Sequence, residues 1–325
     1  MKVHILDDWF DTLRHLPSFE RLSEHEVTIW NDHVEDVDAL AERLADAEAL
    51  VLFRERTPIP GALLDRLPGL KLISQRSVYP HVDVEGCTRN GVLLCSNMHG
   101  DAPSFAAAEL TFALILSAAR QLPKQMASLK AGQWQAGVGQ TLRGRTLGLY
   151  GYGRIAKAVA GYAEAFGMKV LWWASDDGRA RATKDGQAVA ENRTAFFAGA
   201  DVVSLHVRLK PETRGIVTEA DLLAMKPSAI FVNTSRAALV APKAITAALS
   251  AGRPGTIALD VFATEPLADP EDPIVSHPRV IATPHIGYVT EDELDLQFAD
   301  IYDQIGAYAA GAPIHMINPE VLDRH

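Results

Sequence analysis

Three side chains with complementary proton-transfer and anion-binding chemistry occur late in the sequence: Arg236, Glu265 and His285. An imidazole can donate or accept a proton near neutral pH, which suits it to general acid–base catalysis. A carboxylate beside it favours the charged form and fixes the orientation of the ring. A planar guanidinium binds a carboxylate through two parallel hydrogen bonds. Together these groups suit a reaction in which a proton moves to or from an atom close to a bound carboxylate.

Each of the three side chains lies in a short motif at or just past the end of a predicted strand. The motifs are Val232-Asn233-Thr234-Ser235-Arg236, the segment 258–266, and Thr283-Pro284-His285-Ile286-Gly287. Open parallel sheets bind their ligands beyond the carboxyl ends of the strands. We therefore expect these side chains, which are far apart in the sequence, to meet at one edge of a sheet.

A glycine-rich segment upstream has the spacing of a dinucleotide phosphate loop, with Gly151, Gly153 and Ala156 at the three small positions. A predicted strand (146–150) precedes it. A predicted helix follows it, and we place four apolar residues on one face of that helix: Ile155, Val159, Ala163 and Phe166. Gly151 allows the tight turn, and Gly153 leaves room for a pyrophosphate at the helix N-terminus. The alternative is a glycine-rich turn that binds nothing.

The choice between NAD and NADP depends on the end of the next strand, where an acid normally binds the ribose hydroxyls of NAD. Here Ala174 holds that position, and Asp176 and Asp177 follow two and three residues later. Arg179 and Arg181 are nearby, but the two aspartates would repel the 2′-phosphate of NADP. The sequence favours NAD, with NADP as the alternative. A second interpretation makes the two aspartates part of a solvated charged loop.

Short apolar runs alternate with helical patterns along the chain, which predicts an α/β fold with parallel sheets. The predicted strands form two series: 3–6, 27–30, 49–53, 71–74 and 92–95, then 146–150, 169–173, 202–206, 229–232, 256–260 and 279–282. We predict two doubly wound domains, a Rossmann-type dinucleotide domain inserted in a flavodoxin-like substrate domain. We assign residues 102–290 to the dinucleotide domain and residues 1–101 and 291–325 to the substrate domain, because a helical pattern at 292–310 follows the completed second series.

The sequence also predicts where several helices lie and where they begin or end. An apolar stretch at 105–119, too short to cross a bilayer, predicts a buried helix. Thr218 followed by Asp221 predicts a capping box, and Gly252 is a plausible glycine just past a helix at 244–251.

These motifs resemble those of the D-isomer-specific 2-hydroxyacid dehydrogenases, and the likeness covers nearly the whole chain. The resemblance implies a D-stereospecific oxidoreductase that transfers a hydride between NAD(P)H and a small 2-keto or 2-hydroxy acid. It implies that Arg236, Glu265 and His285 form the catalytic set, with His285 as general acid and base, Glu265 orienting it and Arg236 holding the substrate. It also implies a set of cofactor contacts: Ser104, Gly151, Tyr152, Gly153, Arg154, Ile155, Ser175, His206, Thr234 and Asp260.

The first domain departs from the pattern of the family, whose glycine-rich substrate loop is replaced by the segment 74–81. We expect backbone N–H groups of Ser77, Val78 and Tyr79 to bind the substrate carboxylate. Arg76, which belongs to this segment, and Arg54 are candidate partners for an extra anionic group and favour a substrate with a second acidic group. The alternative is that both arginines pair with Glu55 or other acids in a structural network.

Composition and charge limit the partners. The formal charge of -10 argues against nucleic acid, whose phosphates attract basic proteins. Neither Cys87 nor Cys95 lies in a metal-binding or disulfide spacing, so we expect no metal and reduced thiols. We see no signal peptide and expect a cytoplasmic protein without a membrane segment. The family resemblance suggests a homodimer formed through the dinucleotide domain.

Two other functions remain open. One is a non-catalytic NAD(H)-sensing interaction protein, because this fold also serves in that role among relatives of the family and fold alone does not settle function. The other is an enzyme of the same class that acts on a small anion such as formate or phosphite.

Overall fold

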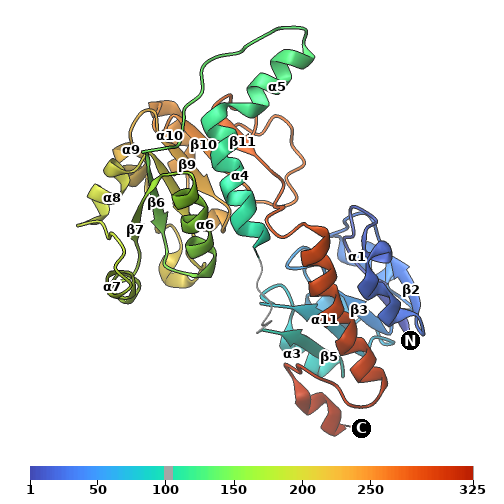
Figure 1. The fold of residues 1–325 in the computed structure, drawn as a ribbon. Helices are drawn as coiled ribbons and strands as arrows, with labels where there is room; N and C mark the ends of the chain where they lie inside the picture. The colour runs from blue at the N-terminus through green and yellow to red at the C-terminus, as the bar shows by residue number, and fades with distance from the viewer. Residues whose placement is uncertain (99–104, 325) are drawn as a thin grey trace. The chain divides into compact units, whose positions relative to one another are not determined.

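The computed structural model describes residues 1–98 and 105–324, and the chain divides into two compact units, each built on its own parallel sheet (Figure 1). Unit 1 consists of Met1–Pro103 and Val289–His325, and unit 2 of Ser104–Tyr288. The chain therefore leaves unit 1, completes unit 2 and returns to unit 1 with its last long helix.

The sheet of unit 1 has the strand order β2-β1-β3-β4-β5, which is the flavodoxin-like order of doubly wound folds. Neighbouring strands are parallel throughout, and Val3 pairs with both Val27 and Ala49. The central strands are short apolar runs, because the sheet is covered on both faces. The strands are β1 Lys2–Ile5, β2 Glu26–Ile29, β3 Ala49–Val51, β4 Leu72–Arg76 and β5 Leu93–Asn97.

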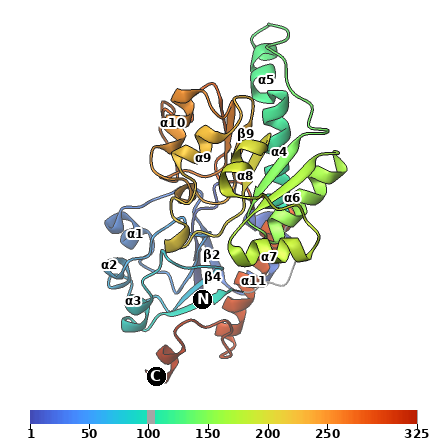
Figure 2. The ribbon, with the colours of Figure 1, turned by 90° about the vertical axis from the view of Figure 1, so that its left-hand side faces the viewer.

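Helices cover both faces of this sheet (Figure 2). On one face lie α1 Val37–Arg43, α2 Gly61–Leu64 and α3 Val84–Arg89, and on the other lies α11 Glu291–Ala309. The aspartates Asp36 and Asp83 begin α1 and α3 by accepting hydrogen bonds from free backbone N–H groups of the first turn. Three short 3-10 helices complete the unit: η1 Leu13–His15, η2 Pro17–Leu22 and η5 Pro319–Arg324.

The sheet of unit 2 has the order β11-β10-β9-β8-β6-β7, again parallel throughout. Beyond β7, Val189 forms a single parallel β-bridge with Trp172. This bridge stands at the position of the outermost strand in the strand order of a Rossmann domain. The strands are β6 Thr146–Tyr150, β7 Lys169–Trp173, β8 Val202–Leu205, β9 Ile230–Asn233, β10 Thr256–Leu259 and β11 Val280–Ala282. The predicted α/β class with two doubly wound sheets is confirmed.

Two buried apolar clusters hold helices against the faces of this sheet. One face carries α4 Ala106–Arg120 and α6 Arg154–Ala165, and the other carries α8 Arg193–Gly199, α9 Glu219–Ala224 and α10 Ala244–Ala251. The capping box is present at the start of α9, and Gly252, with a φ of 76°, ends α10. The remaining elements are α5 Leu122–Lys130, α7 Asp176–Lys184, η3 Pro211–Thr213 and η4 Ala237–Leu239.

One local prediction was wrong, and one alternative interpretation is excluded. The buried face of α6 carries Ala156, Val159, Ala160 and Ala163, whereas Ile155 and Phe166 are exposed, because the helix turns its smallest side chains toward the sheet. The charged segment after β7 is a helix, α7, rather than a loop. It forms because Ser175 accepts a hydrogen bond from the Gly178 N–H at its first turn.

Both cysteines are buried and unpaired, and burial raises the pKa of Cys87 and of Cys95 to about 12. Both are therefore protonated and unreactive at physiological pH. Within the described part of the chain, the helices are either too short or too polar to cross a bilayer.

Candidate active site

The glycine-rich loop connects β6 to α6 and has the geometry that a dinucleotide phosphate site requires. Gly151 has a φ of 117°, and a Cβ placed there would lie 2.2 Å from the backbone oxygen of His206, so only glycine fits. Gly153 precedes the first turn of α6, and a Cβ placed there would meet no atom of the described residues within 4 Å. The helix N-terminus therefore faces open space where a pyrophosphate could approach its N–H groups.

The two glycines predict different variant phenotypes. Gly153→Ala should leave the melting temperature unchanged but weaken NADH binding at least tenfold, because the methyl group occupies only the space needed by the pyrophosphate. Gly151→Ala should lower both the melting temperature and the affinity for NADH, because its methyl group collides with the backbone at His206. Fluorescence titration of NADH and thermal unfolding of both variants test this pair. Unchanged NADH affinity in Gly153→Ala would contradict the assignment of the loop.

The end of β7 carries the residues that would lie nearest the adenosine ribose. Ala174 offers no carboxylate, and Ser175 is occupied in capping α7. The guanidinium of Arg179 stacks on Trp173 at 4.3 Å and also donates to the Ala174 carbonyl and to Asp176. The Tyr152 side chain turns into unit 2, where its hydroxyl donates to Asp185 at 2.5 Å, which leaves only the Tyr152 backbone to face a phosphate.

Two other predicted cofactor contacts have protein partners. Burial lowers the pKa of His206 to about 4, so its ring is neutral, and its Nε2 lies 2.9 Å from the Ser204 hydroxyl. Thr234 shares a 2.6 Å hydrogen bond with Thr111 of α4. The fully buried Asn233 shapes the adjoining turn, because it accepts from the Ser235 N–H and donates to the Arg236 carbonyl. Ser104 lies outside the described residues.

The predicted acid–base pair is present in unit 2. His285 Nδ1 lies 2.5 Å from Glu265 Oε2, and the other oxygen of Glu265 accepts from the Phe262 N–H at 2.7 Å. Burial acts to raise the pKa of Glu265, but the hydrogen bond and charge of His285 outweigh it, helped by the Phe262 N–H and to a lesser degree by the charge of Arg236, so the pKa lies below its ordinary value. Glu265 is thus an anion at physiological pH. It engages Nδ1 of the imidazole and leaves Nε2 as the nitrogen available to a substrate.

Asp260 fixes the loop that carries His285. It is fully buried, and its carboxylate accepts from the Thr283 hydroxyl at 2.6 Å and from the N–H groups of Ile286 and Gly287 at 2.9 Å each. Burial raises the pKa of Asp260, while these hydrogen bonds act in the opposite direction. His285 sits in the middle of this loop with a φ of 52°, a conformation that costs free energy for a non-glycine residue. The contacts of Asp260 therefore indicate a positioning role, one that the sequence reasoning missed.

Arg236 lies just past β9, before η4, and is partly buried. Its Nη1 donates to the Ser235 carbonyl at 2.8 Å, and its charge is close enough to lower the pKa of Glu265. The structure therefore brings all three predicted catalytic side chains to the carboxyl edge of one sheet, beyond β9, β10 and β11. Among the described residues, no group of three or more His, Cys, Asp or Glu could hold a metal ion.

In unit 1, the segment after β4 has the form of an anion-binding turn. Ser77 is left-handed, with a φ of 78°, and its carbonyl is turned inward to accept from the Ser96 hydroxyl at 2.7 Å and from the Gln75 amide at 3.1 Å. The buried Gln75 amide also donates to the Val78 carbonyl at 3.4 Å. Contrary to our expectation, the Ser77 N–H is not free, because it donates to the Asn97 carbonyl at 2.9 Å. Within the described residues, the N–H groups of Val78 and Tyr79 have no hydrogen-bond acceptor. Successive free N–H groups beside a left-handed residue form a nest for an anion.

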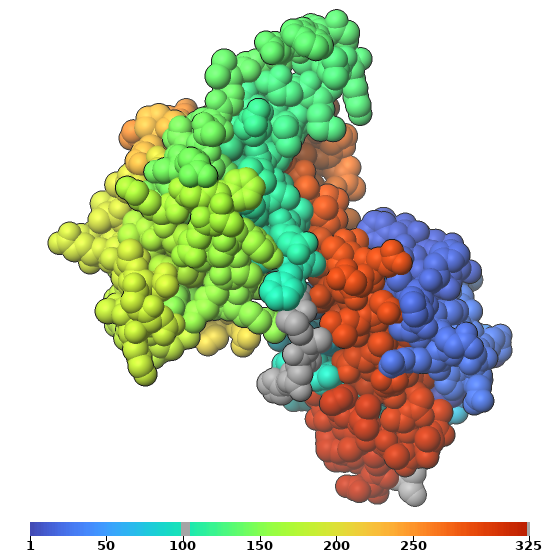
Figure 3. All heavy atoms as spheres, viewed as in Figure 1, coloured from blue at the N-terminus to red at the C-terminus, as the bar shows by residue number. Residues whose placement is uncertain are grey.

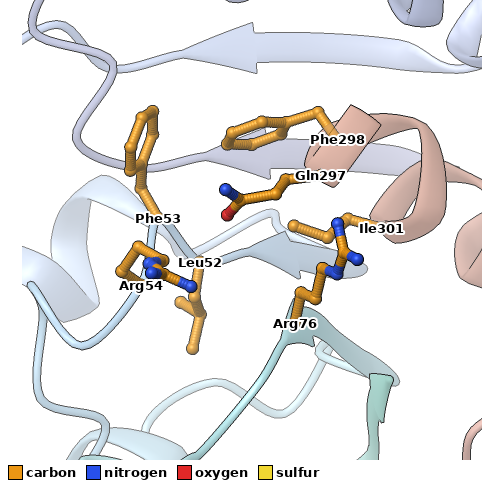
Figure 4. Close-up of a pocket in the computed structure, with 7 residues that line it drawn as sticks. All are labelled: Leu52, Phe53, Arg54, Arg76, Gln297, Phe298 and Ile301. Carbon is orange, nitrogen blue, oxygen red and sulfur yellow. The ribbon is translucent and has the colours of Figure 1, made fainter. Parts of the chain in front are cut away.

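The two arginines predicted near this loop line a small cavity of about 10 Å³, the size of one water molecule (Figure 4). Arg76 points from the end of β4 toward Gln297 and Ile301 of α11, and its Nε lies 3.6 Å from Asp300 Oδ2. Arg54 has a φ of 62° and lines the other side of the cavity. Arg76 is thus largely buried and engaged by an acid of α11.

Comparisons with known proteins agree with this geometry. The sequence profile described as "D-isomer specific 2-hydroxyacid dehydrogenase, NAD binding domain" matches residues 112–287. A glyoxylate reductase of Thermococcus litoralis is 32% identical over 310 residues, which cover 92% of each chain. A D-3-phosphoglycerate dehydrogenase of Methanocaldococcus jannaschii is 36% identical over 78% of this chain, but the match spans only 48% of that longer protein.

Solved structures are similar over nearly the full length. A putative D-3-phosphoglycerate dehydrogenase from Ralstonia solanacearum superposes with a TM-score of 0.94 at 45% identity, covering 99% of this chain and 98% of that one. A phosphoglycerate oxidoreductase from Vibrio cholerae superposes with a TM-score of 0.90 at 44% identity, covering 96% of this chain and 100% of that one. These matches show that the chain belongs to the D-isomer-specific 2-hydroxyacid dehydrogenase family and carries that family's NAD-binding domain.

Proposed function

We propose that this protein is a D-2-hydroxyacid dehydrogenase that interconverts a small 2-keto acid and the corresponding D-2-hydroxy acid with a nicotinamide dinucleotide. The observation that carries the proposal is the 2.5 Å contact between Glu265 and His285, with the charge of Arg236 beside it, at the sheet edge that follows a dinucleotide loop. Each group has a role in the chemistry of a keto acid, and each lies at the end of a different strand.

In this proposal the substrate carboxylate binds Arg236 and the free N–H groups of Val78 and Tyr79. His285 Nε2 donates a proton to the carbonyl oxygen during reduction and accepts it during oxidation. Glu265 holds the imidazole in the required orientation and stabilises its positive charge. The bound dinucleotide supplies or accepts the hydride at the carbonyl carbon.

The residues present fit a dinucleotide. The open helix N-terminus at Gly153 accepts the pyrophosphate, and the exposed Ile155 next to it can contact the cofactor. We propose NAD in preference to NADP, because the exposed carboxylates of Asp176 and Asp177 begin α7 at the end of β7, where a 2′-phosphate would lie. Comparing kcat/KM for NADH and NADPH tests this choice.

The activity is tested by adding 2-keto acids to the protein with NADH and following the loss of absorbance of the reduced cofactor. Glyoxylate, pyruvate and 4-methyl-2-oxopentanoate form a starting panel. Chiral chromatography of the product should give the D enantiomer where one exists. A protein that binds NADH but oxidises it with none of these acids would instead support the alternative of a non-catalytic NAD(H) sensor.

We also propose that the protein is a homodimer formed through unit 2. The helix α5 and the stretch after it stand out from the rest of this unit (Figure 3). They expose Leu122, Met126, Leu129, Trp134 and Val138, and the exposed fractions of Trp134 and Val138 reach 78% and 89%. A row of large apolar side chains of this kind marks a protein interface.

The double substitution Met126→Glu and Leu129→Glu should convert the dimer to a monomer in analytical ultracentrifugation, because it places two charges on this surface. The exposed Leu322 of unit 1, changed to glutamate, is the matched control and should leave the mass unchanged. A wild-type protein that sediments as a monomer would refute the dimer.

The buried, protonated thiols and the absence of a membrane-spanning helix among the described residues also fit our proposal of a cytoplasmic enzyme.

A further inference from the structure

The phosphate loop of unit 2 leaves two backbone N–H groups without an acceptor among the described residues, those of Tyr152 and Gly153. The first turn of the following helix adds further N–H groups that have no acceptor within the helix. A pyrophosphate binds such a loop when these groups point toward the same space. The orientation of the backbone at Tyr152, in the middle of the loop, therefore matters for binding.

The side chain of Tyr152 anchors this loop to the rest of unit 2. Only 6% of the residue is exposed, and its ring packs edge-on against Trp172 of β7 with 4.7 Å between ring centroids. Its hydroxyl donates a hydrogen bond at 2.5 Å to Asp185, the residue that ends α7. The middle of the loop is thus fixed by contacts with a strand and with a helix.

Asp185 is an acceptor that two side chains share. Lys157, near the start of α6, donates to the same carboxylate oxygen at 3.1 Å, and its ammonium group lies 4.3 Å from the centroid of the Tyr152 ring. The hydrogen bonds from Tyr152 and Lys157 lower the pKa of Asp185, so this residue is an anion at physiological pH. A charged acceptor forms a stronger hydrogen bond with the hydroxyl than a neutral oxygen does.

The helix that ends at Asp185 begins at the other part of the cofactor site. Its first residues directly follow the end of β7, where we place the adenosine ribose. The helix packs closely there because Gly178 has no side chain: a Cβ on this glycine would lie 2.7 Å from the Cβ of Ala174. One helix therefore contacts both the strand end near the ribose and the side chain that anchors the phosphate loop.

We propose that Tyr152 is a positioning residue for the dinucleotide, and that its hydrogen bond to Asp185 orients the phosphate-binding N–H groups of the loop. The glycine pattern marks the loop but assigns nothing to the side chain between the two glycines. In this proposal the backbone of Tyr152 contacts the cofactor, while its side chain acts from within unit 2. The inference rests on the proposed fit of a dinucleotide to this loop and holds whichever 2-keto acid is the substrate.

The first test is fluorescence titration of NADH into Tyr152→Phe. Phenylalanine keeps the buried ring and loses only the hydroxyl, so the affinity should fall about threefold to tenfold, in line with the net contribution of one hydrogen bond. Tyr162→Phe is the matched control, because it removes a hydroxyl from α6 at a ring that packs against Phe112 instead. The control should bind NADH as the wild type does. Unchanged affinity in Tyr152→Phe would overturn the proposal.

The second test asks whether Tyr152 acts through Asp185. Asp185→Asn keeps an oxygen that can accept from the hydroxyl, so it should retain more NADH affinity than Asp185→Ala. In a double-mutant cycle, Asp185→Ala should cost less affinity in the Tyr152→Phe background than in the wild type, because the bond is already absent. The cycle also cancels the effect of releasing Lys157, which occurs in both backgrounds. Additive losses would contradict a role of Tyr152 through this carboxylate.

A kinetic comparison separates positioning of the cofactor from a general loss of structure. In Tyr152→Phe the KM for NADH should rise about threefold to tenfold, while kcat at saturating NADH stays within about twofold of the wild type. A lower kcat with an unchanged KM for NADH would argue for a structural role only and would overturn the proposal.

The titrations also keep this inference separate from the proposed function. If no 2-keto acid is reduced, the proposed function fails, and NADH binding to Tyr152→Phe still decides the role of the tyrosine. Gly153→Ala is the reference for the loop itself. A loss of NADH affinity in Gly153→Ala without one in Tyr152→Phe would leave the loop assignment intact and remove the positioning role. A wild type that binds no NADH would overturn both.

Discussion

Replacing His285 by alanine is expected to lower kcat for 2-keto acid reduction by roughly 10² to 10⁴, the usual contribution of a positioned general acid. The loss is expected because the imidazole paired with Glu265 is the group that we propose gives the carbonyl oxygen its proton. Dinucleotide affinity should change little, because the phosphate loop lies at β6 and α6, away from this change. Steady-state kinetics and NADH titration of the purified variant measure both quantities.

Glu265→Gln and Asp260→Asn are the companion variants. Glu265→Gln keeps the shape of the side chain but removes the charge that stabilises the protonated imidazole, so kcat should fall at least tenfold and by less than in His285→Ala. Asp260→Asn should also lower kcat, because an amide cannot accept from all three donors of the loop that carries His285. Near-normal turnover in His285→Ala would show that the proton comes from elsewhere.

Replacing Arg236 by alanine is expected to lower kcat/KM by about 30-fold to 5000-fold. Removing one partner of a hydrogen-bonded charge pair costs about 2–5 kcal/mol, and each 1.36 kcal/mol corresponds to a factor of ten. The effect should appear in both KM and kcat, because the guanidinium binds the carboxylate and also polarises the keto oxygen.

Arg236→Lys is the matched variant, since lysine keeps the charge but lacks the planar fork that binds a carboxylate through two bonds. It should recover only part of the loss seen in Arg236→Ala. Addition of free guanidinium to Arg236→Ala should restore some activity if the missing group acts on the substrate directly. Full activity in Arg236→Lys would show that charge alone is sufficient and would contradict the proposed fork.

Much of the fold could be predicted because its strands are short apolar runs separated by helical patterns. The central strands are buried on both faces, so their sequences carry a strong signal, and the glycine loop fixed where the dinucleotide sheet begins. The exact face of α6 could not be predicted, because the choice between Ala156 and Ile155 as the buried neighbour depends on how closely the helix approaches the sheet. The start of α7 was missed because Ser175 was considered only as a cofactor contact, although a serine before two aspartates is also a helix-capping pattern.

The sequence predicted the site best where a residue type has a single plausible role. The acid–base pair of His285 with Glu265 was expected, and the structure brings it within hydrogen-bond distance. Asp260 was harder, because a buried carboxylate at a strand end can contact a cofactor or hold a loop, and only the three donors around it show what it contacts. Arg76 was harder still, because its partner Asp300 is more than 200 residues away in the sequence.

A crystal structure with NAD(H) and the unreactive keto acid analogue oxamate tests the central claim most directly. The account predicts that one oxygen of the analogue lies within hydrogen-bond distance of His285 Nε2, roughly 2.6–3.2 Å, while Arg236 contacts the analogue and the nicotinamide ring lies against its carbonyl carbon. An analogue bound away from His285 and Arg236, or a nicotinamide that does not reach it, would contradict the account.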